Sequence, residues 1–439
     1  MSSEIDELKK RNEQLQRENE ALRRLVNSRR FRAADRLGNL YNQVLPIETK
    51  RREVVNSTMR GVRKIAHGRK DRWVKENAAQ VAKLAAGHDR VIVIDSIAYH
   101  TKIKQRPHHL AQSFADLGYL VIYLEPTNLT CSYRKITDNI ITINSHKYLS
   151  QIRAKHRYFL LPNTMSMPFS DLKQVLGWGY RLIYDYIDDF HEDISGDLTA
   201  QREIWEQLPK LNPAVCSVTA KQLQKEITEH LKTKSCPIVM APNGVIIEHF
   251  DYRTQNDDEP KDLKPIIQKN HPIVGFYGAL APWIDFDLIH QVAVNHPEWE
   301  IVLVGMDYGG ALAELKPADN IHCLGAKPYD KLVDYAKHFD CAIIPFKNGE
   351  IAKATSPVKL FEYMATGLPT VCTRDLQECR GYDYVYLAKD NADFENKLQQ
   401  AILDHDNPDC RARLVEQATE NTWPQRATAI DEALRSTEK

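Results

Sequence analysis

The stretch S-P-V-K-L-F-E-Y-M-A-T-G-L-P-T-V, Ser356 to Val371, reads as a helix followed by a strand. Ser356 is a good N-cap residue, and Pro357 suits the first helical position, where its missing N–H costs no hydrogen bond. An apolar helix face then runs to Gly367, which ends the helix before an apolar strand begins. The stretch therefore predicts one helix–strand unit of an α/β domain.

The start of this helix lacks the usual acidic partner of its N-cap. A capping box would place Glu at the third helical position, where this sequence has Lys359. Free backbone N–H groups beside a cation favour an anion, and phosphate is the usual one. Glu362, on the same face, can accept two hydrogen bonds from a vicinal diol such as a ribose. The pattern indicates a nucleotide-sugar site; the alternative is a capped surface helix with two solvated charges.

The same stretch resembles the donor-binding segment of glycosyltransferases built from two Rossmann-like domains, the GT-B architecture. The resemblance is to family 4 and its teichuronic-acid-type relatives, and it is more specific in the C-terminal half of the chain. It continues through four segments: G-F-Y-G-A-L-A-P-W-I-D (Gly275–Asp285), V-L-V-G (Val302–Gly305), L-G-A-K-P-Y-D-K-L (Leu324–Leu332) and D-C-A-I-I-P-F (Asp340–Phe346). The resemblance implies an α/β fold with two facing Rossmann-like domains.

The composition is compatible with two or three domains. It disfavours nucleic-acid-binding, secreted and membrane-spanning proteins. The chain has 439 residues and a formal net charge of zero, so whole-molecule attraction to nucleic acid is not indicated. Its eight cysteines include no C-x-x-C pair, and we expect them to be reduced core residues of a cytoplasmic protein. We find no apolar secretory signal at the N-terminus and no run approaching the ~18 apolar residues of a membrane span.

Residues 4–29 have a heptad pattern, which predicts a coiled coil over residues 1–29. Leu8, Leu15 and Leu22 occupy position d, and two asparagines occupy position a. This is typical of a parallel two-stranded coiled coil in which the asparagines fix the register. We therefore expect a homodimer; the alternative is a single amphipathic helix lying on its own domain.

The following segment, residues 30–88, is basic and is predicted to be helical. Residues 23–90 carry 18 Lys and Arg against 6 Asp and Glu. We expect residues 29–88 to be attracted to anionic lipid headgroups, which would place the protein at the inner face of the cell membrane; the alternative is a solvated helical surface. In bZIP proteins the basic region precedes the zipper, whereas here it follows, so no nucleic-acid partner is expected.

From Asp89 onward strands and helices alternate, which predicts doubly wound parallel sheets. We assign residues 89–250 to an N-terminal Rossmann-like acceptor domain and residues 251–270 to a polar linker. Residues 271–423 would form the C-terminal nucleotide-sugar domain. Residues 424–439 would form a final helix, which the GT-B resemblance implies crosses back to the first domain.

Ligands of open parallel sheets bind outside the carboxyl ends of the strands. In the C-terminal domain we therefore expect the donor to contact Gly278, Ser356, Lys359 and Glu362. A glycine at position 278 lets the backbone approach a diphosphate closely, although it could also be a plain turn residue. The resemblance adds Lys327, in the loop that lines the nucleobase pocket of the family.

Two positions depart from the family pattern. A second glutamate, often found eight positions before the ribose-binding one, is replaced by Ala354. The segment Ala281-Pro282-Trp283 stands where the family usually has Arg or Lys after the first strand of the C-terminal domain. Phosphate binding is therefore expected to depend more on Lys359, and the retaining or inverting outcome stays open.

Two polar groups follow strands of the N-terminal domain. Arg106 and His108 come after the first strand, and Arg106 could hold a donor phosphate or an acidic acceptor; a capped helix start with exposed charges is the alternative. Asp188 and Asp189 end a later strand, where grouped carboxylates are costly unless they are used. We expect one of these two to orient the acceptor hydroxyl or the donor sugar, or to act as a general base if the reaction inverts. Helix capping is the alternative.

No metal site and no cofactor are predicted. A D-x-D pattern starting at Asp185 would need a carboxylate where Ile187 stands, and the helix dipole with Lys359 would take the place of a cation. The sequence therefore predicts a metal-independent, hexosyltransferase-type enzyme. It would move a sugar from a nucleotide diphosphate donor to a hydroxyl of a lipid-linked or polymeric cell-envelope glycan. UDP is the first candidate for the nucleotide of the donor. The alternatives are a non-catalytic coiled-coil scaffold with a degenerate GT-B body, and an epimerase or phosphorylase on the same fold.

Overall fold

The structure is a computed structural model, and it describes residues 71–101, 104–126, 132–232, 236–251 and 259–438. The predicted coiled coil of residues 1–29 and most of the basic segment lie outside these residues. A helix over residues 71–85 precedes the first strand, and residues from Glu76 onward form one compact unit. Within the described ranges no helix is long and apolar enough to cross a membrane.

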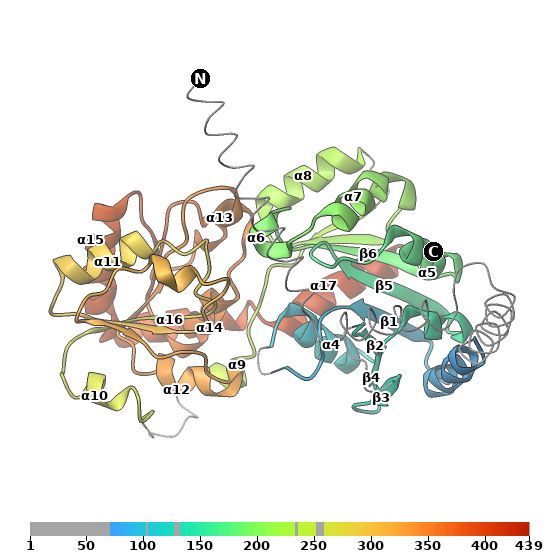
Figure 1. Ribbon diagram of the computed structural model, residues 1–439, viewed down its shortest axis with the longest axis horizontal. Coiled ribbons are helices and arrows are strands. Elements are labelled where there is room, and N and C mark those ends of the chain that lie inside the picture. The colour runs from blue at the N-terminus through green and yellow to red at the C-terminus, as the bar shows by residue number, and fades with distance from the viewer. Residues whose placement is uncertain (1–70, 102–103, 127–131, 233–235, 252–258, 439) are drawn as a thin grey trace, which may run out of the picture. The chain divides into compact units, whose positions relative to one another are not determined.

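The first sheet, coloured blue to green in Figure 1, has the strand order β3-β4-β2-β1-β5-β6-β7-β8. Every neighbouring pair is parallel except β3 and β4. Its central strands are buried apolar runs, as expected for a sheet covered by helices on both faces. The strands are β1 Arg90–Asp95, β2 Leu120–Leu124, β3 Tyr133–Lys135, β4 Ile140–Ile143, β5 His156–Pro162, β6 Arg181–Tyr186, β7 Val215–Val218 and β8 Ile238–Met240.

Helices cover both faces of this sheet. Figure 1 shows α5, α7 and α8 on one face and α4 with α17 on the other. The helical segments are α4 Arg106–Asp116, η1 His146–Gln151, α5 Phe169–Gly177, α6 Glu192–Ser195, α7 Thr199–Leu211, α8 Lys221–Leu231 and, from the end of the chain, α17 Trp423–Ser436. Trp423, Ile430 and Leu434 of α17 are buried in the same core as Leu110 and Phe114 of α4.

The second sheet is entirely parallel, with the strand order β11-β10-β9-β12-β13-β14. Because β9 lies at the centre and the chain leaves it in both directions, the loops after β9 and β12 adjoin at the carboxyl edge, where such sheets bind ligands. The strands are β9 Ile273–Tyr277, β10 Glu300–Val304, β11 Ile321–Cys323, β12 Cys341–Ile344, β13 Thr370–Cys372 and β14 Val385–Leu387.

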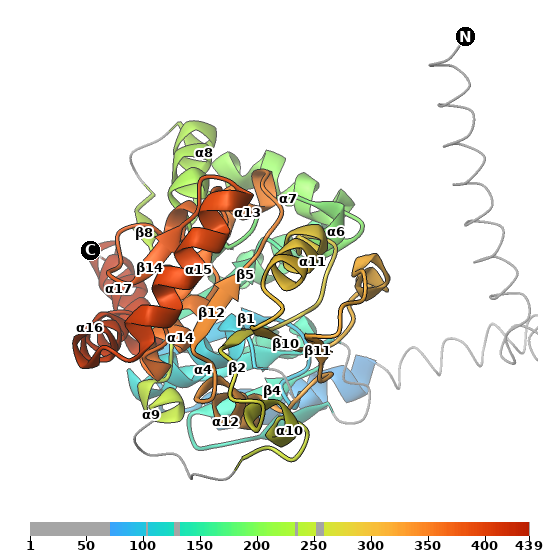
Figure 2. The ribbon, with the colours of Figure 1, turned by 90° about the vertical axis from the view of Figure 1, so that its left-hand side faces the viewer.

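The helices of the second sheet also form two layers, seen from a second side in Figure 2. On one face α11 and α15 lie side by side, and Gln291 donates a hydrogen bond of 2.7 Å to Glu395 between them. On the other face α14 packs along α16 and contacts α12. The helical segments are α9 Ile247–Phe250, α10 Lys264–Ile267, α11 Phe286–Asn295, η3 Ala311–Glu314, η4 Tyr329–Lys331, α12 Leu332–Ala336, α13 Glu350–Ala354, α14 Val358–Thr366, η5 Gln377–Cys379, α15 Asn391–His405 and α16 Pro408–Thr419.

The two sheets are parallel apart from the β3–β4 pair and each is layered with helices, which confirms the α/β fold class that the sequence predicts. Helix α17 follows the second sheet in the chain but packs on the first. Its C-terminal end is held by polar contacts: the Tyr119 hydroxyl donates to Asp431 over 2.6 Å, and the Arg90 guanidinium pairs with Glu438 over 2.5 Å. The last described residues of the chain thus stabilise the first sheet.

Candidate active site

Helix α14 carries the two residues that dominate the predicted donor site. It begins at Val358 with Pro357 as its N-cap, so the predicted N-cap at Ser356 was wrong by one position. The Ser356 hydroxyl instead accepts a hydrogen bond of 3.2 Å from the backbone N–H of Asn243, and its carbonyl accepts one of 2.6 Å from the Asn243 side chain. Ser356 is buried and ties the start of α14 to the segment that follows β8.

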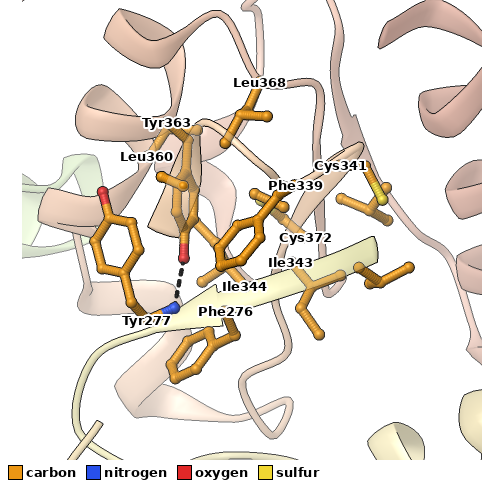
Figure 3. Close-up of a cluster of buried hydrophobic side chains, with 14 of the residues drawn as sticks. Phe276, Tyr277, Phe339, Cys341, Ile343, Ile344, Leu360, Tyr363, Leu368 and Cys372 are labelled. Carbon is orange, nitrogen blue, oxygen red and sulfur yellow. Dashed lines mark hydrogen bonds between the residues drawn. The ribbon is translucent and has the colours of Figure 1, made fainter. Parts of the chain in front are cut away.

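Tyr363 fixes the rotation of α14 on the sheet. Figure 3 shows the Tyr363 hydroxyl accepting a hydrogen bond from the backbone N–H of Tyr277, at the end of β9, with Leu360 in the same apolar cluster. The donor–acceptor distance is 2.9 Å. With this face of α14 turned into the core, Lys359 and Glu362 lie at the carboxyl edge of the sheet.

Lys359 lies over two aromatic rings. Its Nζ is 5.3 Å from the ring centroid of Phe276 and 5.2 Å from that of Phe346, which are cation–π distances. Protein surrounds the ammonium and lowers its pKa to about 8, against the opposing effect of Glu362, yet the side chain is only half-buried. Among the described residues no carboxylate forms an ion pair with it. Such a cation is suited to an anionic ligand.

Gly278 lies directly against Lys359. Its φ is 142°, and a β-carbon at this position would come within 2.8 Å of Lys359 Cε. The loop that it begins is also tight on its other side, because a β-carbon on Gly305 would lie 1.7 Å from the Gly278 carbonyl oxygen. The two glycines therefore allow the loop after β9 to pass between β10 and the lysine.

Glu362 is buried one turn after Lys359, with 3% of its surface exposed. Burial raises its pKa to about 7, while the hydroxyls of Tyr277 and Tyr329 and the charge of Lys359 act in the opposite direction. Both tyrosine hydroxyls are buried, and neither makes a well-aligned hydrogen bond within the described part of the chain. Burial of this carboxyl group therefore brings its pKa close to neutral pH.

Arg106 does not have the role that the sequence suggested. Its Nε and Nη2 donate to the two carboxylate oxygens of Asp185 over 2.8 and 2.9 Å, and its Nη1 donates to the Pro242 carbonyl over 3.2 Å. Arginine and aspartate are both buried. The anion held by Arg106 is thus internal, so it is neither a phosphate ligand nor an exposed charge at a helix start.

His108 and Lys327 are also engaged within the protein. The Nδ1 of His108 accepts from the Gln105 N–H over 3.2 Å, which leaves Nε2 to donate to the Ala98 carbonyl over 3.2 Å. Burial lowers the pKa of His108, so the ring is neutral and structural. The Nζ of Lys327 donates to Asp262 over 2.6 Å, and this pairing, rather than a free cation, occupies the loop after β11.

Asp188 and Asp189 follow β6 and differ in their surroundings. The Asp189 carboxylate accepts from the Phe190 N–H over 2.7 Å, whereas no hydrogen bond among the described residues involves the Asp188 carboxyl group. Burial raises the pKa of Asp188 to about 7, with the nearby aspartates adding to the effect and Arg106 opposing it. The helix-capping alternative fails, because His191 is the N-cap of α6.

Asn163 holds the backbone of this turn, which sequence reasoning missed. Its side chain donates to the Asp188 carbonyl over 2.7 Å and accepts from the Ile187 N–H over 2.9 Å. Asp95 was also missed; it is buried at the carboxyl end of β1, and burial raises its pKa to about 7. The strand-end rule that selected Asp188 would have selected Asp95 as well, whereas nothing in the sequence pairs Asn163 with this turn.

Comparison with known proteins finds similarity to glycosyltransferases. Residues 271–404 match the family described as "Glycosyl transferases group 1". A curated relative, "Putative teichuronic acid biosynthesis glycosyltransferase TuaH" of Bacillus subtilis, is 28% identical over 233 residues, covering 49% of this chain and 57% of its own length. This chain therefore spans little more than half of that relative.

Solved structures share the fold at low identity. A glycosyltransferase from Rickettsia africae has a TM-score of 0.59 and 12% identity, covering 80% of this chain and 99% of its own. A trehalose-6-phosphate protein of E. coli, bound with UDP-2-fluoro glucose, has a TM-score of 0.59 and 10% identity, covering 80% and 99%. In the described residues, no group of three or more His, Cys, Asp or Glu side chains could hold a metal ion. The chain has the GT-B fold, and residues 271–404 match the group 1 glycosyl transferase family.

Proposed function

We propose that this protein is a metal-independent glycosyltransferase that uses a nucleotide diphosphate sugar as its donor. A UDP-sugar is the first candidate. The observation that carries the proposal is the arrangement around Lys359. This ammonium has no carboxylate partner among the described residues, lies against Gly278, and stands one helical turn before Glu362. A diphosphate and a ribose of one nucleotide present an anion and a diol, which are the two chemistries that these side chains can bind.

The roles of the donor-site residues follow from their positions. Lys359 and the backbone N–H groups at the start of α14 would bind the diphosphate, with Gly278 leaving room for its approach. Glu362, when ionised, would accept hydrogen bonds from the ribose hydroxyls. As the glycosidic bond breaks, the leaving nucleotide gains negative charge, and Lys359 would stabilise that charge more than it stabilises the bound donor.

Asp188 is the residue we propose to act on the acceptor. In an inverting reaction the acceptor oxygen bonds to the anomeric carbon, the carbon–oxygen bond to phosphate breaks, and the acceptor proton passes to a carboxylate. The raised pKa of Asp188 suits a base, and its carboxyl group is not used by hydrogen bonds within the described residues. In a retaining reaction the same group would orient the donor sugar.

The acceptor is proposed from the similarity to the Bacillus subtilis protein, whose name refers to teichuronic acid biosynthesis. We propose a hydroxyl of a lipid-linked or polymeric cell-envelope glycan, reached from the cytoplasmic side of the membrane. Residues 29–88 would attract an anionic membrane surface, and residues 1–29 would form a parallel coiled coil in a homodimer. Sedimentation of the full chain and of a chain beginning at residue 30 tests the dimer; if both are dimeric, the interface lies elsewhere.

The test of the activity is a panel of UDP-, GDP- and dTDP-sugars measured by thermal shift and by donor hydrolysis. We expect UDP-sugars to raise the melting temperature of the wild type. Glu362→Gln should lose donor affinity by about 1.5–3 kcal/mol, the scale of a hydrogen bond to a charged group. The matched control is Glu416→Gln, which removes an exposed carboxylate from the same domain.

Two results would contradict the proposal. A protein that binds no member of the panel would be a scaffold with a GT-B body. Binding without any transfer or hydrolysis, even with glycan acceptors present, would make it a sugar-nucleotide binding module. If Glu362→Gln behaves like Glu416→Gln, the nucleotide binds at another place.

A further inference from the structure

Two aromatic side chains lie together at the carboxyl edge of the second sheet. Trp283 belongs to the loop after β9 and Tyr308 to the loop after β10, and their ring centroids are 5.7 Å apart with 50° between the planes. Tyr308 is 40% exposed, whereas Trp283 is partly buried against the core of its domain. Because open parallel sheets bind ligands at this edge, the two rings stand where a ligand is expected.

The exposure of this region is unusual for the protein. Of the large apolar side chains that are exposed within the described residues, Met306 and Tyr308 share this one loop, and the others are scattered over separate segments. The Tyr308 hydroxyl takes part in no hydrogen bond within the described part of the chain. Single exposed apolar residues need no explanation, whereas a group of them at a ligand-binding edge indicates a binding surface.

The backbone that carries the two rings is fixed by hydrogen bonds between neighbouring loops. The N–H of Leu280 donates to the Met306 carbonyl over 2.9 Å, and the N–H of Tyr308 donates to the Leu280 carbonyl over 2.9 Å. The Trp283 carbonyl accepts from the N–H of Lys347, in the loop after β12, over 2.7 Å. The loops are therefore ordered before a ligand arrives, which reduces the entropy cost of binding.

The same loops lead to the proposed diphosphate site. Ile284, the residue after Trp283, forms a β-bridge with Phe346, and the Lys359 ammonium lies 5.2 Å from the centroid of the Phe346 ring. In a nucleotide sugar the diphosphate is bonded to the ribose on one side and to the sugar ring on the other. Since Glu362 is the proposed partner of the ribose, the loops beside Phe346 are left for the sugar.

The chemistry of a sugar ring fits a pair of aromatic side chains. A pyranose has hydroxyl groups around its edge and C–H groups on its faces. The face of an aromatic ring carries partial negative charge and the C–H hydrogens carry partial positive charge, so the two faces attract each other. The Tyr308 hydroxyl can also exchange a hydrogen bond with a hydroxyl of the sugar.

We propose that Trp283 and Tyr308 form a stacking surface for the sugar ring of the donor and contribute to the choice of that sugar. The inference rests on the proposed donor site, and it adds residues that contact neither the phosphates nor the ribose. The loop Gly278–Asp285, which contains Trp283, has no Arg or Lys. It therefore offers the donor an aromatic face and not a cation.

The experiment measures by calorimetry how much the sugar changes the affinity for the nucleotide. The ligands are UDP, UDP-glucose, UDP-galactose and UDP-N-acetylglucosamine. The quantity followed is the Kd of UDP divided by the Kd of the UDP-sugar that the wild type binds best, because this ratio cancels every effect on nucleotide binding itself. Tyr308→Ala should lower the ratio about three- to tenfold, with the Kd of UDP unchanged.

Two further variants of Tyr308 and its surroundings make the comparison specific. Tyr308→Phe keeps the ring and should keep most of the ratio. Leu403→Ala is the matched control, because it truncates another exposed apolar side chain of the same domain, on α15. This control should change neither the ratio nor the Kd of UDP.

Trp283 is tested by a substitution that preserves its packing. Trp283→Leu keeps an apolar side chain against the core and removes the aromatic face, and it should lower the ratio as Tyr308→Ala does. Trp283→Phe should restore part of the ratio. Both Trp283→Leu and Tyr308→Ala should reduce the differences in affinity among the three UDP-sugars. If the melting temperature shows that Trp283→Leu folds poorly, Tyr308→Ala decides the question, because its side chain is exposed.

The outcomes separate this inference from the proposed function. A wild type that binds none of the four ligands contradicts the donor assignment, and the inference falls with it. If the wild type binds UDP and UDP-sugars while the folded variants keep its ratio, only the stacking surface is overturned. Equal losses of affinity for UDP and for the UDP-sugars would place the rings at the nucleotide. Altered sedimentation with an unchanged ratio would make the two residues an interface between copies of the chain, and both of these results reject the inference.

Discussion

Gly278 and Lys359 occupy adjoining space, so that a β-carbon on the glycine would lie 2.8 Å from Cε and 3.3 Å from Nζ of the lysine. The lysine comes from α14 and the glycine from the end of β9, 81 positions earlier in the chain. Their contact places a flexible cation directly over the backbone of a strand-to-helix loop. Any group on Gly278 must therefore displace the lysine from its place above Phe276.

Gly278→Ala should weaken donor binding for this steric reason. The new methyl group would push the Lys359 side chain away, and the φ of 142° is unfavourable for any residue with a β-carbon. We expect UDP-sugar affinity to fall about tenfold or more, measured by calorimetry. Gly381→Ala is the control, because Gly381 has a φ of 97° but no atom within 4 Å of a β-carbon. If the two variants lose the same amount of donor affinity, backbone strain rather than displacement of the lysine explains the loss.

Lys359→Ala should lower kcat on the order of 10²-fold or more, the range for losing one group that stabilises developing charge. Its effect on donor affinity should be smaller. Lys359→Arg should recover only part of the rate, because a planar guanidinium does not fill the place of a point charge over two rings. Steady-state kinetics with the true donor measure both. Turnover near the wild-type rate in Lys359→Ala would remove this residue from the phosphate site.

Donor affinity should have a bell-shaped dependence on pH. Glu362 must be ionised to accept the ribose hydroxyls, and its pKa is about 7, so affinity should rise with pH through that value. Lys359 must be protonated to bind the diphosphate, and its pKa is about 8, so affinity should decline above it. Calorimetry with a UDP-sugar, whose diphosphate does not titrate in this range, measures both limbs. Glu362→Gln should abolish only the rising limb, and a flat profile in the wild type would contradict both assignments.

Arg106 and Asp185 should matter for stability and not for donor chemistry. Both are buried, and removing one partner leaves the other charge uncompensated. Arg106→Ala should therefore lower the free energy of unfolding by about 3–5 kcal/mol, as measured by chemical denaturation. Ser217→Ala is a milder comparison, because it removes only the 2.6 Å hydrogen bond that the serine donates to Asp185. Full stability in Arg106→Ala, with lost donor binding, would restore the phosphate role.

Asp188→Asn should lower transfer strongly while leaving UDP-sugar affinity close to that of the wild type. The reason is that the proposed proton acceptor is lost, whereas the donor groups on α14 are unchanged. General acid–base contributions are about 10²–10⁴-fold, which sets the expected loss in kcat. Asp189→Asn is the control, because the Asp189 side chain already accepts the Phe190 N–H. Equal losses in the two variants would point to the turn itself and not to one carboxylate.

Much of the architecture follows from local patterns. Apolar runs bounded by turn residues predict the strands, and their alternation with amphipathic segments predicts parallel sheets, because both signals depend on residues within a few positions of each other. The start of α14 was predicted one residue early. The Ser356 hydroxyl had two acceptable uses, capping the helix or binding Asn243, and only the fold brings Asn243 within 3.2 Å.

The sequence by itself determined that Gly278 and Asp188 follow strands and that Lys359 and Glu362 lie in the first turns of a helix, and it selected them as candidates by position and residue type. The tertiary structure decided which of the charged groups is already paired. Arg106 meets Asp185 from 79 positions away, and Ser356 meets Asn243 from 113 positions away. The partner of a buried charge depends on strand order and helix rotation, which are set by packing over the whole domain. Local sequence patterns carry no information on those distances, so they identify Lys359 as a cation but cannot show that no carboxylate of the described residues pairs with it.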